Sequence, residues 1–397
     1  MKKKFYSLLL LLTAMLLLPT LNVQGQNFQW ARTLSPTYLP NYMLGSDPSG
    51  NAYTIVNDGL TKYSPQGNQL WVSPLSVSEV DDMVVTHRGV YLLMYTSSSG
   101  SYNYLSLPSQ RIIIIHTNPD GKIVWMKILP HEQIRSIAAD PSGRVYVTGY
   151  IRRGFEVDGI MLTPEKPAAG TQIRHTNILM QFNENGVLQW GRLWNRVANP
   201  VGTIHVGGDL KTDLQGNVYI SLTFNETMLI EGRSFTLPTN NPYYQTLYMK
   251  YNSMGQLQWV DVLPIRGGWD VDYLGNTYFL AIPEGNTLTF NGSTLPDPIA
   301  RTAFFKIDSD GLLQWRRPVY PLSLSNRVMF CDEIGNIYIS GVEDQTPLHD
   351  KCTIVKFNSE TEPLWVKSFT GINSNYYRLL SKSRDFYIRE VYRQGLI

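Results

Sequence analysis

Two short segments of the sequence contain histidine or aspartate residues at a spacing that resembles part of a metal-binding motif. The segment HEQIR, from His131 to Arg135, begins like a zinc-binding helix, but Arg135 stands where a second histidine is required. The segment DSDG, from Asp308 to Gly311, begins like a calcium loop, but no Glu completes the twelve-residue pattern, so we interpret it as a turn. The sequence also has no nucleophile elbow and no phosphate loop. We therefore predict no metal, no cofactor and no nameable catalytic residue.

The two cysteines, Cys331 and Cys352, are candidates for a disulfide in an exported chain. The strand pattern places them on two strands of one sheet with a third strand between them. Strands two apart are separated by roughly 9.5 Å, beyond the roughly 7 Å between Cα atoms that a bridge tolerates. We therefore predict no disulfide and two buried thiols.

The N-terminus has the pattern of a signal peptide. Three lysines are followed by the apolar run Leu8–Leu18, and small residues precede an expected cleavage site before Gln26. Cleavage leaves 31 basic against 32 acidic residues, too little positive charge for a nucleic-acid partner. No second long apolar run follows. We expect residues 1–25 to be removed and residues 26–397 to form one domain without an integral membrane segment, monomeric and either periplasmic or extracellular.

A turn motif repeats along the mature chain. The pattern Asp-x-x-Gly followed three residues later by Tyr occurs five times, with its tyrosines at Tyr53, Tyr146, Tyr219, Tyr278 and Tyr338. Two weaker copies end at Tyr91 and Tyr387. Such a pattern predicts a hairpin in which Asp caps the turn, Gly adopts a positive φ and Tyr lies on the outgoing strand.

A second hairpin pattern follows each of the first six copies: an alternating strand, a polar turn ending in Gly, and a Trp four residues later. The tryptophans are Trp71, Trp125, Trp190, Trp259, Trp315 and Trp365, the last with Thr361 in place of Gly. Each unit therefore holds four strands. The spacing between successive motif tyrosines, 38 to 73 residues, is typical of propeller blades with variable loops and is too uneven for a solenoid.

The two ends of the repeat are complementary. A Trp strand around Trp30 precedes the first Tyr motif, whereas ten residues and no Trp strand follow Tyr387. If the N-terminal strand joins the C-terminal blade, seven blades close into a ring without loose edges. The sequence therefore predicts an all-β, seven-bladed β-propeller of four-stranded antiparallel blades, with Phe28 to Leu34 paired to the C-terminal segment.

These motifs resemble the seven-bladed beta-propeller repeat (SBBP) family of exported bacterial proteins. In that family a blade reads D-x-x-G-N-x-Y, an insertion, then K-x-x-x-x-G-x-x-x-W. The insertions 155–164, 228–238 and 288–298 are similar to its extra β-hairpin. The resemblance implies a propeller but no defined activity. The Gly-x-x-x-Trp spacing is also similar to quinoprotein propellers, whose Ala-x-Asp-x-x-Thr is missing here, so we expect no bound quinone.

A ligand site is expected at one mouth of the central channel, where the connections between blades meet the loops joining second and third strands. Residues near the start of the inner strands, eight before each turn glycine, would line it, and a tryptophan beside two glycines could stack on a sugar or an aromatic group. The resulting candidates are Tyr42, Asp81, Arg135, Trp269, Arg327 and Tyr376. The alternative is a hydrated channel entrance with no specific ligand.

The predicted function is non-enzymatic: a binding or scaffolding module for a protein or glycan on the long-loop face. The alternative is a polysaccharide lyase or hydrolase at the channel mouth. An enzyme should bring titratable groups with shifted pKa values together in one pocket. A binding module should present a broad aromatic and polar surface.

Overall fold

The computed structural model describes residues 44–56, 59–77, 79–130, 132–164, 176–197, 208–224, 227–236, 245–263, 265–283, 287–296, 302–319, 324–343, 351–370, 377–380 and 387–390. Every regular element within these ranges is a β-strand. The fold is therefore all-β, as the sequence predicts, and no helix in the described ranges is long and apolar enough to span a bilayer.

Four-stranded antiparallel units follow one another along the chain, with their strands side by side in sequence order. Sheet 1 contains β1 (Leu44–Ser46), β2 (Ala52–Val56), β3 (Gly59–Tyr63) and β4 (Gln69–Ser76). Sheet 2 contains β5 (Glu79–Thr86), β6 (Gly89–Thr96), β9 (Arg111–Thr117) and β10 (Ile123–Leu129). Sheet 3 contains β11 (Gln133–Ala139), β12 (Val145–Ile151), β15 (Thr176–Phe182) and β16 (Leu188–Val197).

The second half of the chain continues the series. Sheet 4 contains β17 (Gly208–Thr212), β18 (Val218–Phe224), β21 (Gln245–Tyr251) and β22 (Leu257–Val262). Sheet 5 contains β23 (Ile265–Val271), β24 (Thr277–Pro283), β27 (Ala303–Ile307) and β28 (Leu313–Pro318). Sheet 6 contains β29 (Leu324–Cys331), β30 (Ile337–Glu343), β31 (Lys351–Phe357) and β32 (Pro363–Thr370). The last described pair is β33 (Tyr377–Leu380) with β34 (Tyr387–Glu390).

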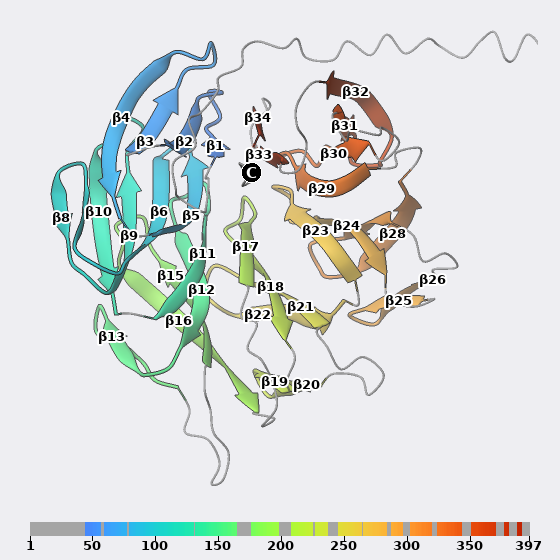
Figure 1. Cartoon of the computed structure of the whole chain (residues 1–397). Coiled ribbons are helices and arrows are strands. Elements are labelled where there is room, and N and C mark those ends of the chain that lie inside the picture. The colour runs from blue at the N-terminus through green and yellow to red at the C-terminus, as the bar shows by residue number, and fades with distance from the viewer. Residues whose placement is uncertain are drawn as a thin grey trace, which may run out of the picture.

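The sheets are arranged around a common centre, toward which the first strand of each sheet faces (Figure 1). First strands of neighbouring sheets contact each other in chain order from β1 through β5, β11, β17, β23 and β29 to β33. β33 also contacts β1, so strands from the two ends of the described chain lie close together.

Short hairpins are inserted between the second and third strands of sheets 2 to 5. They are β7 (Gly100–Tyr102) with β8 (Leu105–Leu107), β13 (Phe155–Val157) with β14 (Ile160–Leu162), β19 (Thr227–Ile230) with β20 (Arg233–Phe235), and β25 (Thr287–Phe290) with β26 (Ser293–Pro296). The last three are confirmed predictions. The first was not predicted, because its turn, Asn103-Tyr104, lacks the glycine that ends the other three turns.

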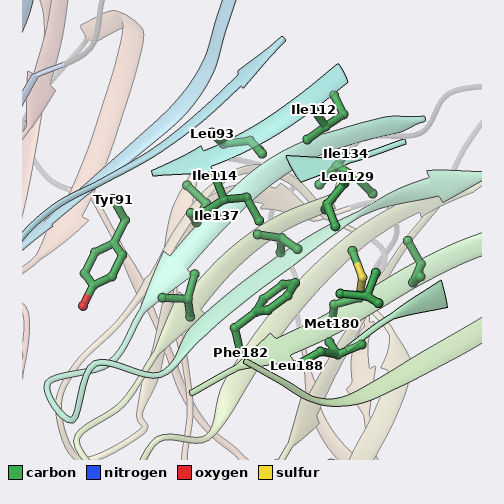
Figure 2. Packing of buried hydrophobic residues seen from close by; sticks show 14 of the residues in the cluster. Tyr91, Leu93, Ile112, Ile114, Leu129, Ile134, Ile137, Met180, Phe182 and Leu188 are labelled. Carbon is green, nitrogen blue, oxygen red and sulfur yellow. The ribbon is translucent and has the colours of Figure 1, made fainter. Parts of the chain in front are cut away.

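The core lies between the sheets. In β9 six consecutive residues, from Ile112 to Thr117, are buried, because both faces of the strand pack against neighbouring sheets. Figure 2 shows the cluster between sheets 2 and 3, in which Leu93 and Ile114 of sheet 2 lie with Ile137 and Phe182 of sheet 3. Outer strands such as β10 are more exposed.

The turn aspartates have the capping role that the sequence predicts. Asp47 accepts hydrogen bonds at Oδ1 from the N–H groups of Ser49 and Asn51, each at 3.0 Å, and at Oδ2 from Tyr53 Oη at 2.9 Å. Gly50 adopts φ 78°. Corresponding bonds from the Tyr hydroxyl recur at Asp213, Asp272 and Asp332.

Four of the motif tryptophans join their sheet to the next. Their indole N–H groups donate to the carbonyl of the second turn residue in the following sheet, Trp71 to Pro119 at 3.1 Å, Trp125 to Glu184 at 3.0 Å, Trp190 to Ser253 at 3.1 Å and Trp259 to Ser309 at 3.3 Å. Close packing requires glycine at the end of these turns, in addition to the positive φ. A Cβ at Gly186 would lie 2.6 Å from the Trp125 ring, so a larger residue would push the sheets apart.

The third strand adds a cation above the motif tyrosine. A lysine Nζ lies over the ring in sheets 1, 4, 5 and 6, at 5.1 Å for Lys62, 5.2 Å for Lys250, 5.4 Å for Lys306 and 4.9 Å for Lys356. In sheet 2 the imidazole of His116 stacks on Tyr91 with the ring centroids 4.1 Å apart. These contacts give the repeated lysine a packing role.

Candidate functional site

Three of the six predicted site residues fall on β-bulges at one end of the inner strands, opposite the end that carries the Asp turns. β5 is irregular between Val80 and Asp82, and β11 between Ile134 and Ser136, so Asp81 and Arg135 are the extra residues. β29 is irregular between Ser325 and Val328, a stretch that contains Arg327. A bulge turns its side chain out of the strand's alternation, and bulges are frequent beside active sites.

Asp81 and Arg135 form an ion pair between sheets 2 and 3. Arg135 Nη1 donates to Asp81 Oδ1 and lies 3.6 Å from Glu79 Oε2, while Nη2 donates to Gln133 Oε1 at 2.5 Å. The Asp81 side chain is only 2% exposed, whereas that of Arg135 is 40% exposed and covers it. The structure thus brings together two of the predicted residues and adds Glu79 and Gln133.

The Asp81 carboxyl group is electrostatically unfavourable in this position. Burial raises its pKa to about 6, although the Arg135 guanidinium opposes the rise. Its Oδ2 is buried and has no hydrogen-bond partner, which leaves one acceptor uncompensated. The charged form of Asp81 is therefore only partly compensated by Arg135.

Two further inner-strand aspartates satisfy backbone groups of the next sheet. Asp82 Oδ2 accepts from the N–H of Ile137 at 2.9 Å and from Ser136 Oγ at 3.1 Å, and burial raises the pKa of Asp82 to about 6. Asp270 Oδ2 accepts from the N–H of Cys331 at 2.9 Å. Inner strands are sheet edges whose outward N–H groups need acceptors, so these carboxylates have a structural role.

A lysine lies among these acids. Lys211 Nζ is 3.2 Å from Asp209 Oδ2. Burial disfavours the charge on Lys211, but Asp209 and Asp270 together raise its pKa above the ordinary value, so the amine stays protonated at neutral pH. Lys211, Asp209 and Asp270 therefore form a charged network on the inner strands β17 and β23.

Trp269 lies in the core between sheets 4 and 5. Its side chain is 9% exposed and meets Tyr248 edge to face, with the ring centroids 5.7 Å apart. Its ring therefore offers no open face for stacking, in contrast to the role expected from the sequence. The neighbouring Gly267 leaves no gap either, because a Cβ there would lie 2.0 Å from the Leu280 carbonyl oxygen.

The remaining predicted residues are not placed as side chains. Tyr42 and Tyr376 lie outside the described residues, and Arg327 is described by its backbone in β29 alone. Cys331 is a buried thiol on β29, and Cys352 lies on β31. The strand β30 pairs with both and separates their backbones, as the sequence predicts.

The opposite end of the inner strands holds a depression that the sequence did not indicate. Residues from all six sheets line it: Ser46, Pro48, Val84, Val85, Thr86, His87, Ala139, Pro141, Thr212, Tyr273 and Glu333. The turns around it are bonded to one another, with the Leu214 N–H donating to the Tyr273 carbonyl at 3.1 Å and Tyr273 Oη to Glu333 Oε1 at 2.8 Å. These hydrogen bonds fix the position of Tyr273, which lines the depression.

The sites considered for metal have other partners or fall outside the described residues. Asp308 Oδ1 accepts from the N–H groups of Asp310 at 3.0 Å and Leu312 at 2.8 Å, as expected for a turn cap. His131 is outside the described residues, and Arg135 belongs to the ion pair. Within the described ranges no three His, Cys, Asp or Glu side chains are grouped as metal ligands.

Comparisons with known proteins identify all-β, propeller-like neighbours. A protein of unknown function from Bacteroides caccae is 12% identical, with 79% of this chain and 90% of that chain covered and a TM-score of 0.41. A mutant of the Synechocystis apocarotenoid oxygenase is 9% identical, with coverages of 88% and 74% and a TM-score of 0.44. The WD40 domain of Neurospora crassa Pan2 is 8% identical, with coverages of 82% and 86% and a TM-score of 0.38. No family model and no curated protein matches the chain.

Proposed function

We propose that this protein is an exported seven-bladed β-propeller of the SBBP type that acts as a non-enzymatic binding or scaffolding module for a protein or glycan. Residues 1–25 are its signal peptide, and residues 26–397 are one monomeric domain in the periplasm or outside the cell. The observation that carries the function is the set of inserted hairpins, which lie at the periphery of the arrangement in Figure 1.

Closure of the ring is supported by the contacts of β33 with β29 and with β1. In the four sheet junctions described above, a Trp indole donates to the second residue of the next sheet's outer turn. The corresponding turn of sheet 1 is Ser64 to Gly67, and its second residue is Pro65. Phe28 to Leu34 lie outside the described residues. The proposed closure predicts that this segment joins β33 and β34 as the seventh blade and that Trp30 donates to the Pro65 carbonyl in the same way.

Replacement of Trp30 by Ala tests closure. The variant should lose stability to the same extent as Trp259→Ala, about 3 to 5 kcal/mol, because both remove a large ring from a junction between sheets. Urea unfolding of the two mature variants measures this. A loss below about 1 kcal/mol for Trp30→Ala alone would mean that the N-terminal strand completes no blade.

The hairpins are suited to recognition because each is held against the preceding sheet. β7 pairs with β4, and β19 pairs with β16. The β13–β14 hairpin is tied to sheet 2 by an ion pair of 2.8 Å between Lys127 Nζ and Asp158 Oδ1. The Asn291 N–H of the β25–β26 hairpin donates to Asp261 Oδ2 of sheet 4 at 2.7 Å. A surface ordered before binding loses less entropy when a ligand arrives.

Exposed apolar side chains lie on three of these rigid hairpins. They are Tyr104 (85% exposed), Leu105 (43%), Met161 (61%) and Leu229 (36%). The mature protein should be screened on a glycan array and against immobilised envelope proteins, and the bound region mapped by hydrogen exchange. Added protection should appear in residues 100–107, 155–162, 227–235 or 287–296. Protection confined to the inner-strand bulges would place the site at the channel mouth instead.

The alternative function is a polysaccharide lyase or hydrolase, and the pKa of about 6 at Asp81 favours it. Asp81 is nevertheless covered by Arg135, and Asp82 is bonded to the next sheet. Incubation of the mature protein with polysaccharides, followed by assays for unsaturated and reducing ends, tests this function. Turnover that is lost in Asp81→Asn would establish the enzyme and replace the binding role.

A further inference from the structure

The tip of the β7–β8 hairpin carries an aromatic side chain in an unusual backbone conformation. Each inserted hairpin turns through two residues with positive φ, and in three of them the second residue is glycine, Gly159, Gly232 or Gly292, at φ 79° to 81°. In the β7–β8 hairpin that position is Tyr104, at φ 65°. A bulky residue in the left-handed region is strained, and glycine is the residue that local folding prefers there.

The strain at Tyr104 has no compensating contact in the fold. The side chain is 85% exposed. At the equivalent glycines a Cβ would meet nothing within 4 Å, so this turn position faces open space. A conformation that costs free energy and contributes no burial points to a role outside folding.

The rest of the hairpin holds Tyr104 in a fixed position. Tyr102 is fully buried and Leu107 is 2% exposed, both in the core cluster shared by sheets 1 and 2. The Asn103 N–H donates to the Pro74 carbonyl at 2.7 Å, and Leu75 and Ser76 of β4 pair with β7. The ring of Tyr104 is thus presented on a braced turn, which is the arrangement that binding sites require.

The segment that carries Tyr104 contains no charged residue. The segment SSSGSYNYLSLPSQ, residues 97–110, holds six serines, two tyrosines and an asparagine, and no Asp, Glu, Lys or Arg. Tyr, Ser, Gly and Asn are also the residues that antibody loops use for recognition, because a rigid ring supplies contact area and small polar groups supply adaptable hydrogen bonds. A charged ligand would find no counter-ion on this segment.

We propose that the β7–β8 hairpin binds a neutral glycan, with Tyr104 stacked against the C–H face of a sugar ring and the exposed serine and asparagine side chains bonded to its hydroxyl groups. The assignment rests on the binding function proposed above and names its ligand class. Neutral sugars fit the site because they offer an apolar ring face and uncharged hydroxyls together. The exposed Leu105 extends the apolar contact beside the ring.

The test uses the mature protein on an array of neutral and acidic oligosaccharides, followed by calorimetry with the strongest neutral ligand. Tyr104→Gly should lose at least about tenfold in affinity, the usual effect of removing an aromatic anchor. It should at the same time unfold at a higher temperature than wild type, because glycine relieves the strain. Tyr104→Phe should keep the affinity within about threefold, since stacking needs the ring rather than the hydroxyl.

Met161→Ala is the matched control, because Met161 is 61% exposed on the neighbouring β13–β14 hairpin. Its affinity should equal that of wild type. A neutral glycan that binds Tyr104→Gly as tightly as wild type, or a lower melting temperature for Tyr104→Gly, would overturn the glycan assignment and leave the binding function standing. Binding of acidic glycans or of proteins alone would also overturn the assignment, whereas the proposed binding function itself fails if neither screen finds a ligand.

Discussion

The two ends of the inner strands differ in how regular they are. At the turn end, Asp47, Asp213, Asp272 and Asp332 accept the same tyrosine hydroxyl bond in four sheets. At the bulged end each sheet has its own residues, and the Asp81–Arg135 pair occurs at one junction. In these four sheets the aspartate and the tyrosine hydroxyl satisfy each other, whereas Tyr91 Oη at a turn without the aspartate and Asp81 Oδ2 at the bulged end are buried without a partner. The repeat therefore specifies the fold from the turn end of the inner strands, and the residues at the bulged end vary from sheet to sheet.

The largest effect should come from the repeated contacts between sheets. Trp259 is buried, donates to Ser309 and meets Phe290 edge to face. Trp259→Ala should lower the free energy of unfolding by about 3 to 5 kcal/mol, because it removes a large ring and leaves a cavity. Urea unfolding measures this, with the exposed Leu312→Ala as a control that should stay within about 0.5 kcal/mol. Equal effects in the two variants would contradict the role assigned to the tryptophans.

A turn aspartate should matter nearly as much. Asp272 accepts from the N–H groups of Leu274 and Asn276, from the Asn276 side chain and from the buried Tyr278 hydroxyl. Asp272→Ala should cost about 2 to 4 kcal/mol, since it strands these donors, whereas Tyr278→Phe should cost about 1 kcal/mol. Thermal unfolding of both variants checks the order, and a larger loss in Tyr278→Phe would show that the carboxylate is not the centre of the turn.

The contribution of Asp81 to the free energy of unfolding should fall as pH rises, which is the opposite of what a carboxylate with a lowered pKa contributes. Because the Asp81 pKa is raised from 3.8 to about 6, the folded state binds more protons than the unfolded state across this window. Its contribution to stability therefore falls as pH rises from about 4 to 6, by at most about 3 kcal/mol. Denaturant unfolding at both ends of the window should show a smaller fall in Asp81→Asn than in wild type.

In Asp81→Asn the free energy of unfolding should still fall somewhat as pH rises, because the pKa of Asp82 is raised over the same window. Glu156→Gln, on an exposed residue of β13, is the control and should leave the wild-type slope unchanged. An identical slope in Asp81→Asn and wild type would show that Asp81 ionises as freely in the folded protein as in the unfolded chain.

The smallest expected effect lies where the repeat departs from its own pattern. Thr361 adopts φ 60° at a turn position that is glycine in sheets 1 to 5. Thr361→Gly should stabilise the protein by about 0.5 to 1 kcal/mol, because it relieves a β-branched residue in the left-handed region. Differential scanning calorimetry should show a higher melting temperature. A decrease would mean that the threonine side chain has a packing role that outweighs its strain.

The fold could be predicted in detail where the signal was local. The turn glycines and the capping aspartates were found because their residue types are required by nearby backbone geometry, and three of the inserted hairpins were expected from the family resemblance. The β7–β8 hairpin was missed because Tyr104 breaks the Asn-Gly signature. Trp269 was expected at the channel mouth, but its register in β23 aims it at Tyr248 in the neighbouring sheet.

By itself the sequence determined the repeating four-stranded unit, since the Asp-x-x-Gly and Gly-x-x-x-Trp turns act over a few residues and fix which strands pair. Tertiary structure alone decided which side chains meet across sheets. Asp81 and Arg135 are 54 residues apart, and their contact depends on how two bulged strands pack. Tertiary structure also decides exposure. The neighbouring sheet covers Trp269, which is 9% exposed, whereas Tyr104 is 85% exposed.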